Sequence, residues 1–541
     1  MKKRVSAVFL TVFAAALMSQ TAFALDHDVV ILHTNDVHCG IESNIGYSGL
    51  AGFKEEMQGE TPYVTLVDAG DAIQGAPVGT LSEGEYLVQI MNEAGYDFAI
   101  PGNHEFDYGM DRLLSLSSRL DCGYYSCNFV NLPSKTTVFA PYKMMTYDDI
   151  KVAYVGVSTP ESITKSTPAY FQDIFGRYRY GFCEDATGEA LYGQIQKYVD
   201  DARNKGADYV VVVGHLGNDG TTEYWSSRSV IANTTGIDAL IDGHSHEAYT
   251  ETIANKDGEP VVLTQTGTKL ANIGKITITT EGEVKAELVA SVPEEAAEAV
   301  SGQAMTDTIN GIKAQYEESL KVVLGHTDVE LTDKNPETGA RAVRNSETNL
   351  GDFCADAMRY TMGADIGFMN GGGIRANIEA GDITYEDALT VFPYGNMICM
   401  VEISGQNIKD ALEMGVKNYP EESGGFIHAS GLTYTVDSSV PSSVVTDEKK
   451  NFAGVSGEYR VKDIYVGDEP LDVNKTYTLA SHNYWLKSGG DGMTMLTDNV
   501  ILKDETMVDV DTITTYISEC LGGNVGEAYA DPKGQGRITI K

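Results

Sequence analysis

The amino-acid sequence predicts a layered α/β fold built from more than one domain. Short apolar runs of strand length recur along the first half of the chain, and helix-like segments such as residues 87–94 and 191–205 lie between them. Strands that alternate with helices are typical of α/β units. From about Arg341 a second α/β series begins, with its own glycine-rich loop at residues 370–375. At 541 residues the chain is also too long for a single hydrophobic core.

Five apolar runs in the first half are predicted strands, and each ends in polar residues. The runs are residues 29–32, 63–67, 98–100, 209–213 and 239–241. Open α/β sheets place their binding sites at the carboxyl ends of strands, where residues far apart in the sequence converge. We therefore expect the polar residues after these runs to form one site. Residues 261–263 and 275–280 are expected as closing strands.

The polar residues after the five runs include a set rich in imidazole and carboxylate. Its members are Asp36, His38, Asp71, Asn103, His215, His244 and His246. Carboxylate and imidazole ligands without thiolate suit divalent ions such as Zn, Mn or Co. Seven ligands are too many for one ion and suit two ions that share a bridging carboxylate, an arrangement used for phosphoryl transfer.

The stretch from Gly102 to Asp107, with the sequence Gly-Asn-His-Glu-Phe-Asp, supplies the candidate catalytic pair. His104 can donate a proton to a developing oxyanion, and Asp107 can hold its imidazole in the protonated form. Taken alone, the stretch is equally compatible with an Asn-His pair that satisfies backbone groups in a loop. The polar ends of the other strands favour the catalytic interpretation.

A polar, helix-favouring segment follows the first series of strands and helices. It opens at Pro293 and runs to about Leu324. We predict a connecting helix, with residues 293–340 joining a catalytic domain (25–292) to a C-terminal domain (341–541). The alternative is that the segment is a surface helix of the first domain.

The first 24 residues have the pattern of a cleaved secretory signal. Three basic residues precede an apolar stretch, and Ala22-Phe23-Ala24 is a small-x-small cleavage site. The stretch is short for a membrane span of ~20 residues, and no later stretch reaches that length. We therefore predict a protein exported to the periplasm or to the cell surface and medium, without stable insertion into a membrane.

The net charge of −39 opposes binding to a nucleic-acid polymer, which requires a basic surface. A small anionic substrate would need positive charge concentrated locally, from metal ions and a few arginines. The seven cysteines are an odd number, so at least one is free or pairs with another chain. No CxxC pair occurs, which argues against a structural zinc knuckle. The sequence makes no prediction of oligomeric state.

Five short motifs together resemble a known family. They are Asp-x-His at 36–38, Gly-Asp at 70–71, Gly-Asn-His-Glu at 102–105, Gly-His at 214–215 and Gly-His-Ser-His at 243–246. In this order they resemble the calcineurin-like metallophosphoesterases, and with the second domain the chain looks like the 5'-nucleotidase/UDP-sugar hydrolase branch. The resemblance covers essentially the whole chain after residue 24. It implies an N-terminal metallophosphoesterase sandwich joined by a helix to a smaller C-terminal substrate-binding domain.

The resemblance also implies a division of the ligands between two metals. One metal takes Asp36, His38, Asp71 and His246. The other takes Asp71, Asn103, His215 and His244, so that Asp71 forms the bridge. Metal-activated water then attacks phosphorus, and His104, paired with Asp107, stabilises the transition state or protonates the leaving oxygen.

In the family, the C-terminal domain binds the nucleoside part of the substrate. The matching residues here are Arg344, Asn370, Arg375, Tyr394, Trp485 and Asp491. The two arginines can bind phosphate or carboxylate oxygens bidentately, Asn370 can bond a base edge, and Asp491 can accept from ribose hydroxyls. Tyr394 and Trp485 look like the pair between which a base stacks, where the family often has Phe at both positions. The alternatives are a core aromatic for Trp485 and a turn residue for Asp491.

The resemblance thus implies an exported two-metal phosphohydrolase that releases phosphate from nucleoside 5'-monophosphates and related nucleotides. Alternatives within the same class are a 2',3'-cyclic-nucleotide phosphodiesterase and a UDP-sugar or nucleotide pyrophosphatase. A thiosulfohydrolase-like branch shares the metal site, but Arg375 and the paired aromatics argue against it. A non-catalytic surface binding protein would be expected to have lost ligands, and all seven are present. In relatives the C-terminal domain rotates to carry substrate to the metals, and we extend that hypothesis to this chain.

Overall fold

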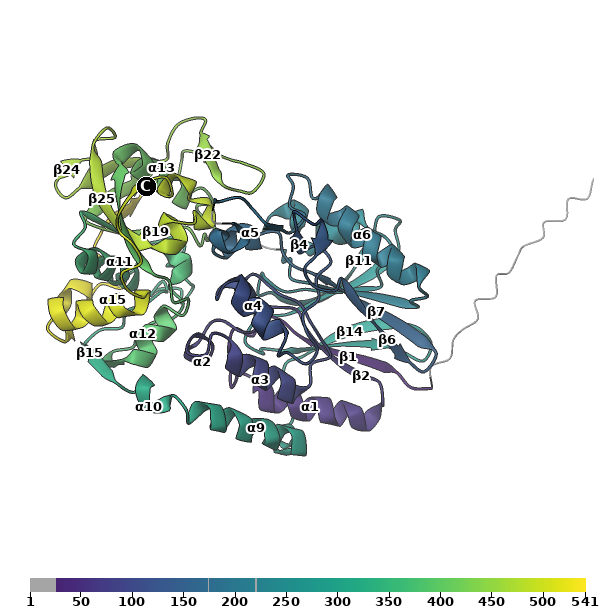
Figure 1. Ribbon diagram of the computed structural model, residues 1–541. Coiled ribbons are helices and arrows are strands. Elements are labelled where there is room, and N and C mark those ends of the chain that lie inside the picture. The colour runs from purple at the N-terminus through teal and green to yellow at the C-terminus, as the bar shows by residue number, and fades with distance from the viewer. Residues whose placement is uncertain (1–25, 174, 219–220) are drawn as a thin grey trace, which may run out of the picture.

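The computed structural model describes residues 26–173, 175–218 and 221–541 (Figure 1). The predicted secretory signal of residues 1–24 lies outside the described residues. The predicted α/β fold is confirmed, since sheets and helices alternate in layers in both halves of the chain. Among the described residues, no helix is both long and apolar enough to cross a membrane.

The first sheet contains five strands in the order β14-β13-β1-β2-β3. Their bounds are β1 (Val29–Thr34), β2 (Val64–Asp68), β3 (Phe98–Ala99), β13 (Ile273–Ile278) and β14 (Val284–Val289). Strands β1, β2 and β3 run parallel, with Val30 opposite Val64 and Val67 opposite Phe98. The carboxyl ends of these three strands therefore lie along one edge of the sheet.

The second sheet contains six strands in the order β11-β12-β10-β9-β7-β6. Their bounds are β6 (Tyr142–Tyr147), β7 (Ile150–Val157), β9 (Tyr209–Gly214), β10 (Ala239–Ile241), β11 (Ala248–Ala254) and β12 (Pro260–Thr266). Strands β7, β9, β10 and β12 are parallel. All five predicted strands and both predicted closing strands are thus present in the two sheets.

The two sheets pack face to face around an apolar core. Ile31 and Val67 of the first sheet and Val152 and Val211 of the second are among its buried side chains. Burying a side chain of this size contributes about 1.5–3 kcal/mol relative to leaving it exposed. Because parallel strands in this position are covered on both faces, their sequences are continuous apolar runs and do not alternate with polar residues.

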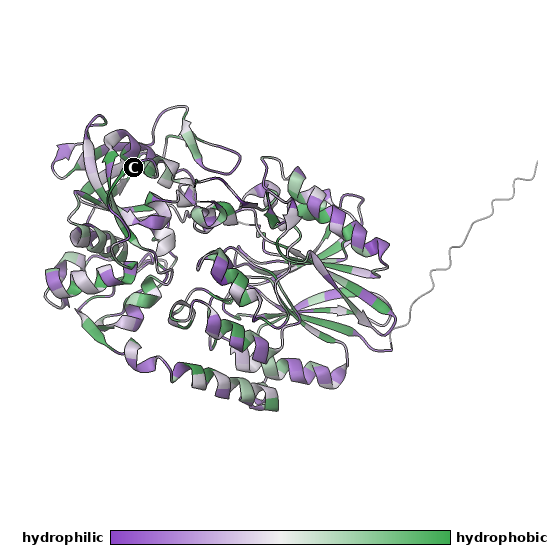
Figure 2. Cartoon of the chain, viewed as in Figure 1, coloured by the Kyte–Doolittle hydropathy of each residue, from purple (hydrophilic) through white to green (hydrophobic). Residues whose placement is uncertain are grey.

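Helices cover the outer faces of both sheets and complete a four-layer sandwich (Figure 1). The helices are α1 (Gly46–Glu60), α3 (Glu85–Ala94) and α9 (Val300–Lys313) on the first sheet, and α6 (Glu189–Asn204) and α7 (Ser227–Asn233) on the second. The covering helices carry both hydrophobic and hydrophilic residues, as amphipathic helices do (Figure 2). The helices predicted at residues 87–94 and 191–205 correspond to α3 and α6.

The described segment 293–324 forms three helices in place of the single helix that we expected. These are α8 (Glu294–Glu298), α9 and α10 (Glu317–Leu320). The backbone is extended at Ala299 (φ −59°, ψ 163°), which separates α8 from α9. Helix α9 buries Met305 and Ile309 against the first sheet's core. The segment therefore covers the first sheet and also leads along one side of the molecule to the second half (Figure 1).

The second half of the chain is built on a five-stranded sheet in the order β19-β16-β25-β18-β26. Its strands are β16 (Ile366–Asn370), β18 (Ile398–Ser404), β19 (Ile427–Ser430), β25 (Thr476–His482) and β26 (Val500–Lys503). The helices α11 (Asn349–Met362), α12 (Tyr385–Val391), α13 (Gly405–Gly415) and α15 (Asp509–Thr515) accompany it.

Strands β16 and β25 are parallel neighbours, and this pairing builds part of the site. Asn370 at the end of β16 therefore lies beside the end of β25, where its Oδ1 is 2.9 Å from His482 Nε2. The short helix α14 (Asn483–Leu486) starts directly after β25. Side chains from these two strand ends accordingly reach the same region.

Candidate metal centre and adjoining pocket

The seven predicted metal ligands converge at the carboxyl ends of β1, β2, β3, β9 and β10. Three groups of side chains have donor atoms that all lie within 4.8 Å of one another. The first is Asp36, His38 and His246, and the second is Asp71, His215 and His244. A third, His38, Asp71 and His104, shares one member with each of them. The first two groups correspond to the two metal sites implied by the family resemblance, although the ligand roles themselves stay predictions.

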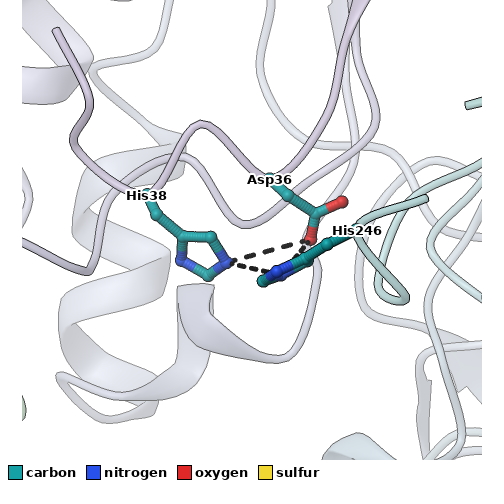
Figure 3. A group of neighbouring side chains, drawn as sticks. All are labelled: Asp36, His38 and His246. Atoms are coloured by element: carbon teal, nitrogen blue, oxygen red, sulfur yellow. Dashed lines mark hydrogen bonds and ion pairs between the residues drawn. The ribbon is translucent and has the colours of Figure 1, made fainter. Parts of the chain in front are cut away.

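The first group directs three donor atoms to one point (Figure 3). His38 Nε2 lies 3.0 Å from His246 Nε2 and 3.9 Å from Asp36 Oδ1. His246 Nε2 lies 3.3 Å from the same carboxylate oxygen. Two imidazole nitrogens and one carboxylate oxygen therefore face each other closely enough to share a cation.

The carboxylate of Asp71 lies between the two groups. Its Oδ2 is 3.1 Å from His215 Nε2 in the second group and 3.9 Å from His38 Nε2 in the first. Its Oδ1 accepts a hydrogen bond of 2.8 Å from the backbone N–H of His104. This position is the one that a bridging carboxylate would need.

The loops that carry the ligands have an unusual backbone. Five of the seven predicted ligands, Asp36, His38, Asp71, His244 and His246, have φ between 46° and 79°. Each non-glycine residue in this left-handed region costs about 1–3 kcal/mol, and such residues cluster at functional sites. Glycines allow the loops to approach, since a Cβ on Gly102 would lie 2.3 Å from Asp71 Oδ1.

Two buried carboxylates behind the ligands hold these loops in place. Glu105 accepts hydrogen bonds of 2.7–2.8 Å from the backbone N–H groups of Asp71, Ala72 and Gly102. Asp242 accepts two more from the residues that follow His215. Burial raises the pKa of Glu105 to about 7. The loops are thus fixed by side chains that do not themselves belong to the predicted ligand set.

Hydrogen bonds orient two of the imidazoles toward the cluster. His38 Nδ1 lies 3.1 Å from the carbonyl oxygen of Gln74, and His215 Nδ1 lies 2.7 Å from that of Ala69. Donation to a carbonyl fixes the tautomer in which Nε2 carries no proton and can bind a metal. Metal-binding histidines are held in this way in other proteins.

The residues of the centre fit a divalent cation. Asn103 Oδ1 is buried and has no hydrogen-bond partner among the described residues. An unpaired buried acceptor costs about 1–3 kcal/mol, which a bound cation would offset. The set combines carboxylate, amide and imidazole donors without thiolate, as expected for Zn, Mn or Co.

His104 and Asp107 form the close pair that the sequence predicts. His104 Nδ1 lies 2.6 Å from Asp107 Oδ2, and its Nε2 lies 4.0 Å from Asp71 Oδ2. Burial lowers the pKa of His104, but the carboxylates of Asp107 and Asp71 outweigh burial and raise the pKa above its ordinary value. The imidazole is thereby favoured in its protonated form beside the centre.

A pocket of about 900 Å³ extends from the centre to the second half of the chain. Both members of the His104–Asp107 pair line it, together with Asp71, Asn103, His244 and His246. On the opposite side it is lined by five of the six predicted substrate-binding residues, Arg344, Asn370, Arg375, Tyr394 and Asp491. The structure therefore brings four of the seven predicted metal ligands and five of the six predicted substrate-binding residues into one cavity.

Two guanidinium groups in the pocket have no acidic partner. Arg341 nearby is paired with Glu422, whereas neither Arg344 nor Arg375 forms an ion pair with any residue that the structure describes. Burial and the neighbouring Arg375 lower the pKa of Arg344 to about 9. Two uncompensated cations in an otherwise acidic protein favour an anionic ligand in this pocket.

Trp485 does not reach the pocket, contrary to our prediction. Its side chain is 0% exposed and packs in the apolar core of the second half. Its Nε1 donates to Asp491 Oδ2 at 3.3 Å. The preceding residue, Tyr484, lines the pocket in its place. Successive residues on a helix point about 100° apart, so helix α14 directs these two aromatics to different sides.

The predicted stacking pair of Tyr394 and Trp485 is therefore not formed. Tyr394 instead lies against His104, with ring centroids 5.6 Å apart, and the Cζ of Arg375 is 5.8 Å from the Tyr394 ring centroid. Asp491 has a left-handed backbone (φ 55°), which agrees with the alternative of a turn residue, and it also lines the pocket.

Sequence reasoning missed two residues at the site, Tyr484 and Glu161. Glu161 Oε2 lies 2.9 Å from Nε2 of the predicted ligand His244. A signal for Glu161 exists, because β7 is a sixth apolar run and Glu161 follows its end by four residues. For Tyr484 the sequence offers only its position next to Trp485.

Two family models match the chain. The model described as "Calcineurin-like phosphoesterase" matches residues 29–248, and the model described as "5'-nucleotidase, C-terminal domain" matches residues 323–498. The first contains all seven predicted metal ligands. The second contains all six predicted substrate-binding residues.

Individual proteins resemble the chain over nearly its whole length. Protein UshA of Escherichia coli (strain K12) is 26% identical over 591 residues, which cover 99% of each protein. The trifunctional nucleotide phosphoesterase protein YfkN of Bacillus subtilis (strain 168) is 28% identical over 562 residues, and the chain spans 35% of that protein's length. The crystal structure of a 5'-nucleotidase precursor from Thermus thermophilus superposes with a TM-score of 0.75 at 25% identity, covering 95% of this chain and 99% of that one.

Proposed function

The chain belongs to the family that joins a calcineurin-like phosphoesterase domain to a 5'-nucleotidase C-terminal domain, and we propose that it hydrolyses nucleoside 5'-monophosphates and related nucleotides to nucleoside and phosphate. The family makes it a hydrolase with a metal-binding site. The substrate proposal rests on one observation, a single pocket lined by candidate metal ligands and by candidate nucleotide-binding residues. The printed names of similar proteins, a nucleotide phosphoesterase and a 5'-nucleotidase, support it.

Two divalent ions would be held by the two groups of ligands. Asp36, His38, Asp71 and His246 would hold one, and Asp71, Asn103, His215 and His244 the other. Bound there, a divalent ion supplies Lewis acidity that neutralises phosphoryl charge and makes water nucleophilic near neutral pH. The donor set suits Zn, Mn or Co.

His104 acts on the charge that develops in the transition state. Asp107 accepts a hydrogen bond from the Nδ1–H of His104 and so holds the imidazole in one orientation with a proton available at Nε2. From the pocket wall, this Nε2–H can donate to a phosphoryl oxygen or to the leaving oxygen. The contact of His104 with Tyr394 keeps the imidazole close to the substrate-binding residues.

The second half of the chain selects the nucleotide. Arg344 and Arg375 bind anionic oxygens, since both guanidiniums lack an acidic partner among the described residues. Asn370 and Asp491 bond the base edge and the ribose. Tyr394 and Tyr484 supply the aromatic walls, a role that we had assigned to Tyr394 and Trp485. Stacking of a base on such a wall contributes about 1–3 kcal/mol.

The proposed domain boundaries separate catalysis from nucleotide selection. We assign catalysis to residues 25–292, the connection to residues 293–340 and nucleotide selection to residues 341–541. The predicted signal at residues 1–24 supports export of the mature chain.

A substrate panel tests the proposal against its alternatives. Purified mature chain, stripped of metal and reloaded with Mn²⁺, Co²⁺ or Zn²⁺, is given AMP, 2',3'-cyclic AMP and UDP-glucose side by side. We expect metal-dependent phosphate release from AMP, with His104→Ala strongly impaired. Turnover of the cyclic or sugar substrate alone would be consistent with the proposed metal centre but would contradict the proposed substrate. No turnover of any of them with metal bound would favour a binding protein.

A further inference from the structure

The third oriented histidine of the centre has a different kind of partner from the other two. His38 and His215 each use Nδ1 to contact a backbone carbonyl. His244 uses Nε2, which lies 2.9 Å from the side-chain oxygen Oε2 of Glu161. Glu161 comes from the loop after β7 and is separated from His244 by 83 residues. No motif contains it.

The carboxylate of Glu161 is itself fixed from the other side. Its second oxygen, Oε1, accepts hydrogen bonds from Thr222 N at 2.8 Å and from Thr222 Oγ1 at 2.7 Å. The residue is only 9% exposed. Both oxygens are therefore engaged, and the group cannot turn away from His244 without breaking charge-assisted hydrogen bonds.

Glu161 does not belong to the ligand cluster. Among the described residues, the donor atoms that gather near His244 come from Asp71 and His215. A neutral imidazole has one donor nitrogen and one acceptor nitrogen, so a carboxylate at Nε2 selects the tautomer with the proton on Nε2. That tautomer leaves Nδ1 unprotonated.

We propose that Glu161 is a positioning residue that holds His244 in the tautomer and orientation needed to bind metal through Nδ1. Glu161 accepts a hydrogen bond from the Nε2–H of His244, and no bond to the substrate or to the metal is required of it. The inference rests on the proposed metal centre and is independent of the substrate. Carboxylate partners of metal-binding histidines have this role in other proteins, and their loss lowers metal affinity about 10- to 100-fold.

Metal binding without substrate is the decisive measurement. Metal-free wild type, Glu161→Gln and Thr222→Val are titrated with Mn²⁺ and, separately, with Zn²⁺ in a calorimeter. The Gln side chain keeps the volume of Glu161, but it has one acceptor oxygen and cannot accept from His244 and from Thr222 together. Thr222→Val removes the hydroxyl donor to Oε1 and leaves the contact with His244 intact, so it is the matched control.

We expect wild type to bind two ions and Glu161→Gln to lose about 10- to 100-fold in affinity at one of the two sites. Thr222→Val should bind both ions as wild type does. The absorption spectrum of the Co²⁺-loaded protein should change in Glu161→Gln alone, because only there does the coordination of one ion change.

Unchanged affinity of both sites in Glu161→Gln would overturn the inference. Equal losses of metal affinity in Glu161→Gln and Thr222→Val would overturn it too. They would show that Glu161 acts by holding the loop at residue 222 and not by orienting His244. Wild type that binds no metal would instead contradict the proposed metal centre, which separates the two failures.

A measurement on wild type covers the case in which the variants do not fold. Nitrogen-15 chemical shifts of the Zn²⁺-loaded protein should show His244 protonated at Nε2. Protonation at Nδ1 would overturn the inference without any substitution. Glu161→Asp, which is one methylene too short to reach both partners, should lose metal affinity as Glu161→Gln does.

Discussion

The ring of Tyr394 lies against the imidazole of His104, with centroids 5.6 Å apart and planes inclined by 29°. Tyr394 belongs to the second half of the chain, and His104 belongs to the first. Next to this contact, Thr80 Oγ1 donates to the carbonyl oxygen of Pro393 at 2.6 Å. A member of the candidate catalytic pair and a candidate nucleotide-binding residue therefore lie in contact, which makes their cooperation testable by substitution.

Replacing Tyr394 should weaken substrate binding. Base stacking contributes about 1–3 kcal/mol, so Tyr394→Ala is expected to raise KM for AMP roughly 5- to 150-fold. Tyr394→Phe keeps the ring and is the control, with KM close to wild type. Steady-state kinetics with reloaded metal measure both. A KM for Tyr394→Ala within twofold of wild type would show that the ring does not contact the substrate.

The two neighbouring aromatics of helix α14 should respond in opposite ways. Trp485 fills the core, so Trp485→Ala should lower the free energy of unfolding by about 3–5 kcal/mol. Tyr484 Oη donates to the carbonyl of Thr164 and accepts from Asp491 N, at 2.8 and 3.0 Å. Tyr484→Phe keeps the ring but releases Asp491 from this hydrogen bond, so it should raise KM for AMP while the core around Trp485 stays packed. A stable Trp485→Ala with a raised KM would restore Trp485 as the stacking residue.

Adding a methyl group at Gly102 should disrupt the metal centre. The new Cβ would lie 2.3 Å from Asp71 Oδ1 and 2.9 Å from Asp71 N, so the Asp71 carboxylate, the candidate bridge, must move. We expect Gly102→Ala to lose bound metal and phosphate release together. The control is Gly193→Ala in helix α6, where nothing lies within 4 Å of the new Cβ. That change should leave activity intact and stabilise the fold by roughly 0.5–1 kcal/mol. Full metal content in Gly102→Ala would contradict the account.

Acid should destabilise the second half of the chain through His428. Burial lowers the pKa of His428 to about 4, and its Nε2 lies 2.8 Å from the carbonyl oxygen of Val343. In the unfolded chain the pKa is about 6.5, so between pH 6.5 and 4 the unfolded state binds more protons. Stability is therefore lost as pH falls through this window, by an amount on the order of 3 kcal/mol.

Comparison with a variant separates the contribution of His428 from the pH dependence that titrating carboxylates also produce. His428→Gln cannot take up the proton, so the difference in unfolding free energy between wild type and variant should shrink as pH falls from about 6.5 to 4. Urea denaturation of the metal-free protein at several pH values measures it. A difference that stays constant over the window would show that His428 titrates normally in the folded state.

A hairpin of the second half reaches across to the first half (Figure 1). It consists of β21 (Val444–Thr446) and β22 (Phe452–Val455). In its turn Lys449 forms an ion pair with Glu184, and the Lys450 ammonium lies 4.7 Å from the Tyr224 ring centroid. If rotation of the C-terminal domain gates turnover, fixing this contact should slow it.

A disulfide between residues 184 and 449 provides that test. Oxidised Glu184→Cys/Lys449→Cys protein should have a lower kcat for AMP than wild type, and reduction should restore it. The single variant Lys449→Cys controls for oxidation elsewhere. Full turnover with the disulfide formed would show that this contact does not need to open.

The sequence was most informative where candidate site residues follow predicted strands along the chain. Asp36, Asp71 and His215 lie within three residues of the ends of buried strands. Parallel strands bring their carboxyl ends together, so these residues converge because of the topology. The continuous apolar runs identified those strands because both of their faces are covered. Five of the six residues predicted to bind substrate line the pocket, although their roles stay predictions.

Three features could not be obtained in this way. Helix α14 has only four residues, and its rotation about its own axis decides which side chain faces the pocket. A shift of one residue would turn Trp485 toward the pocket and Tyr484 toward the core. The contact of Glu161 with His244 joins residues from separate strand ends through side chains alone, and no local pattern encodes it. The connecting segment was expected as one helix, because its composition does not reveal the extended backbone at Ala299.

The measurement to make first is phosphate release from AMP by metal-free protein reloaded with Mn²⁺, with Asp71→Asn treated identically. It asks whether one pocket combines a two-metal centre bridged by Asp71 with a nucleotide-binding wall. The account predicts turnover that depends on the added metal, two bound ions in wild type and loss of both activity and one or both ions in Asp71→Asn. AMP hydrolysis that persists without metal, or that is undiminished in Asp71→Asn, would contradict it.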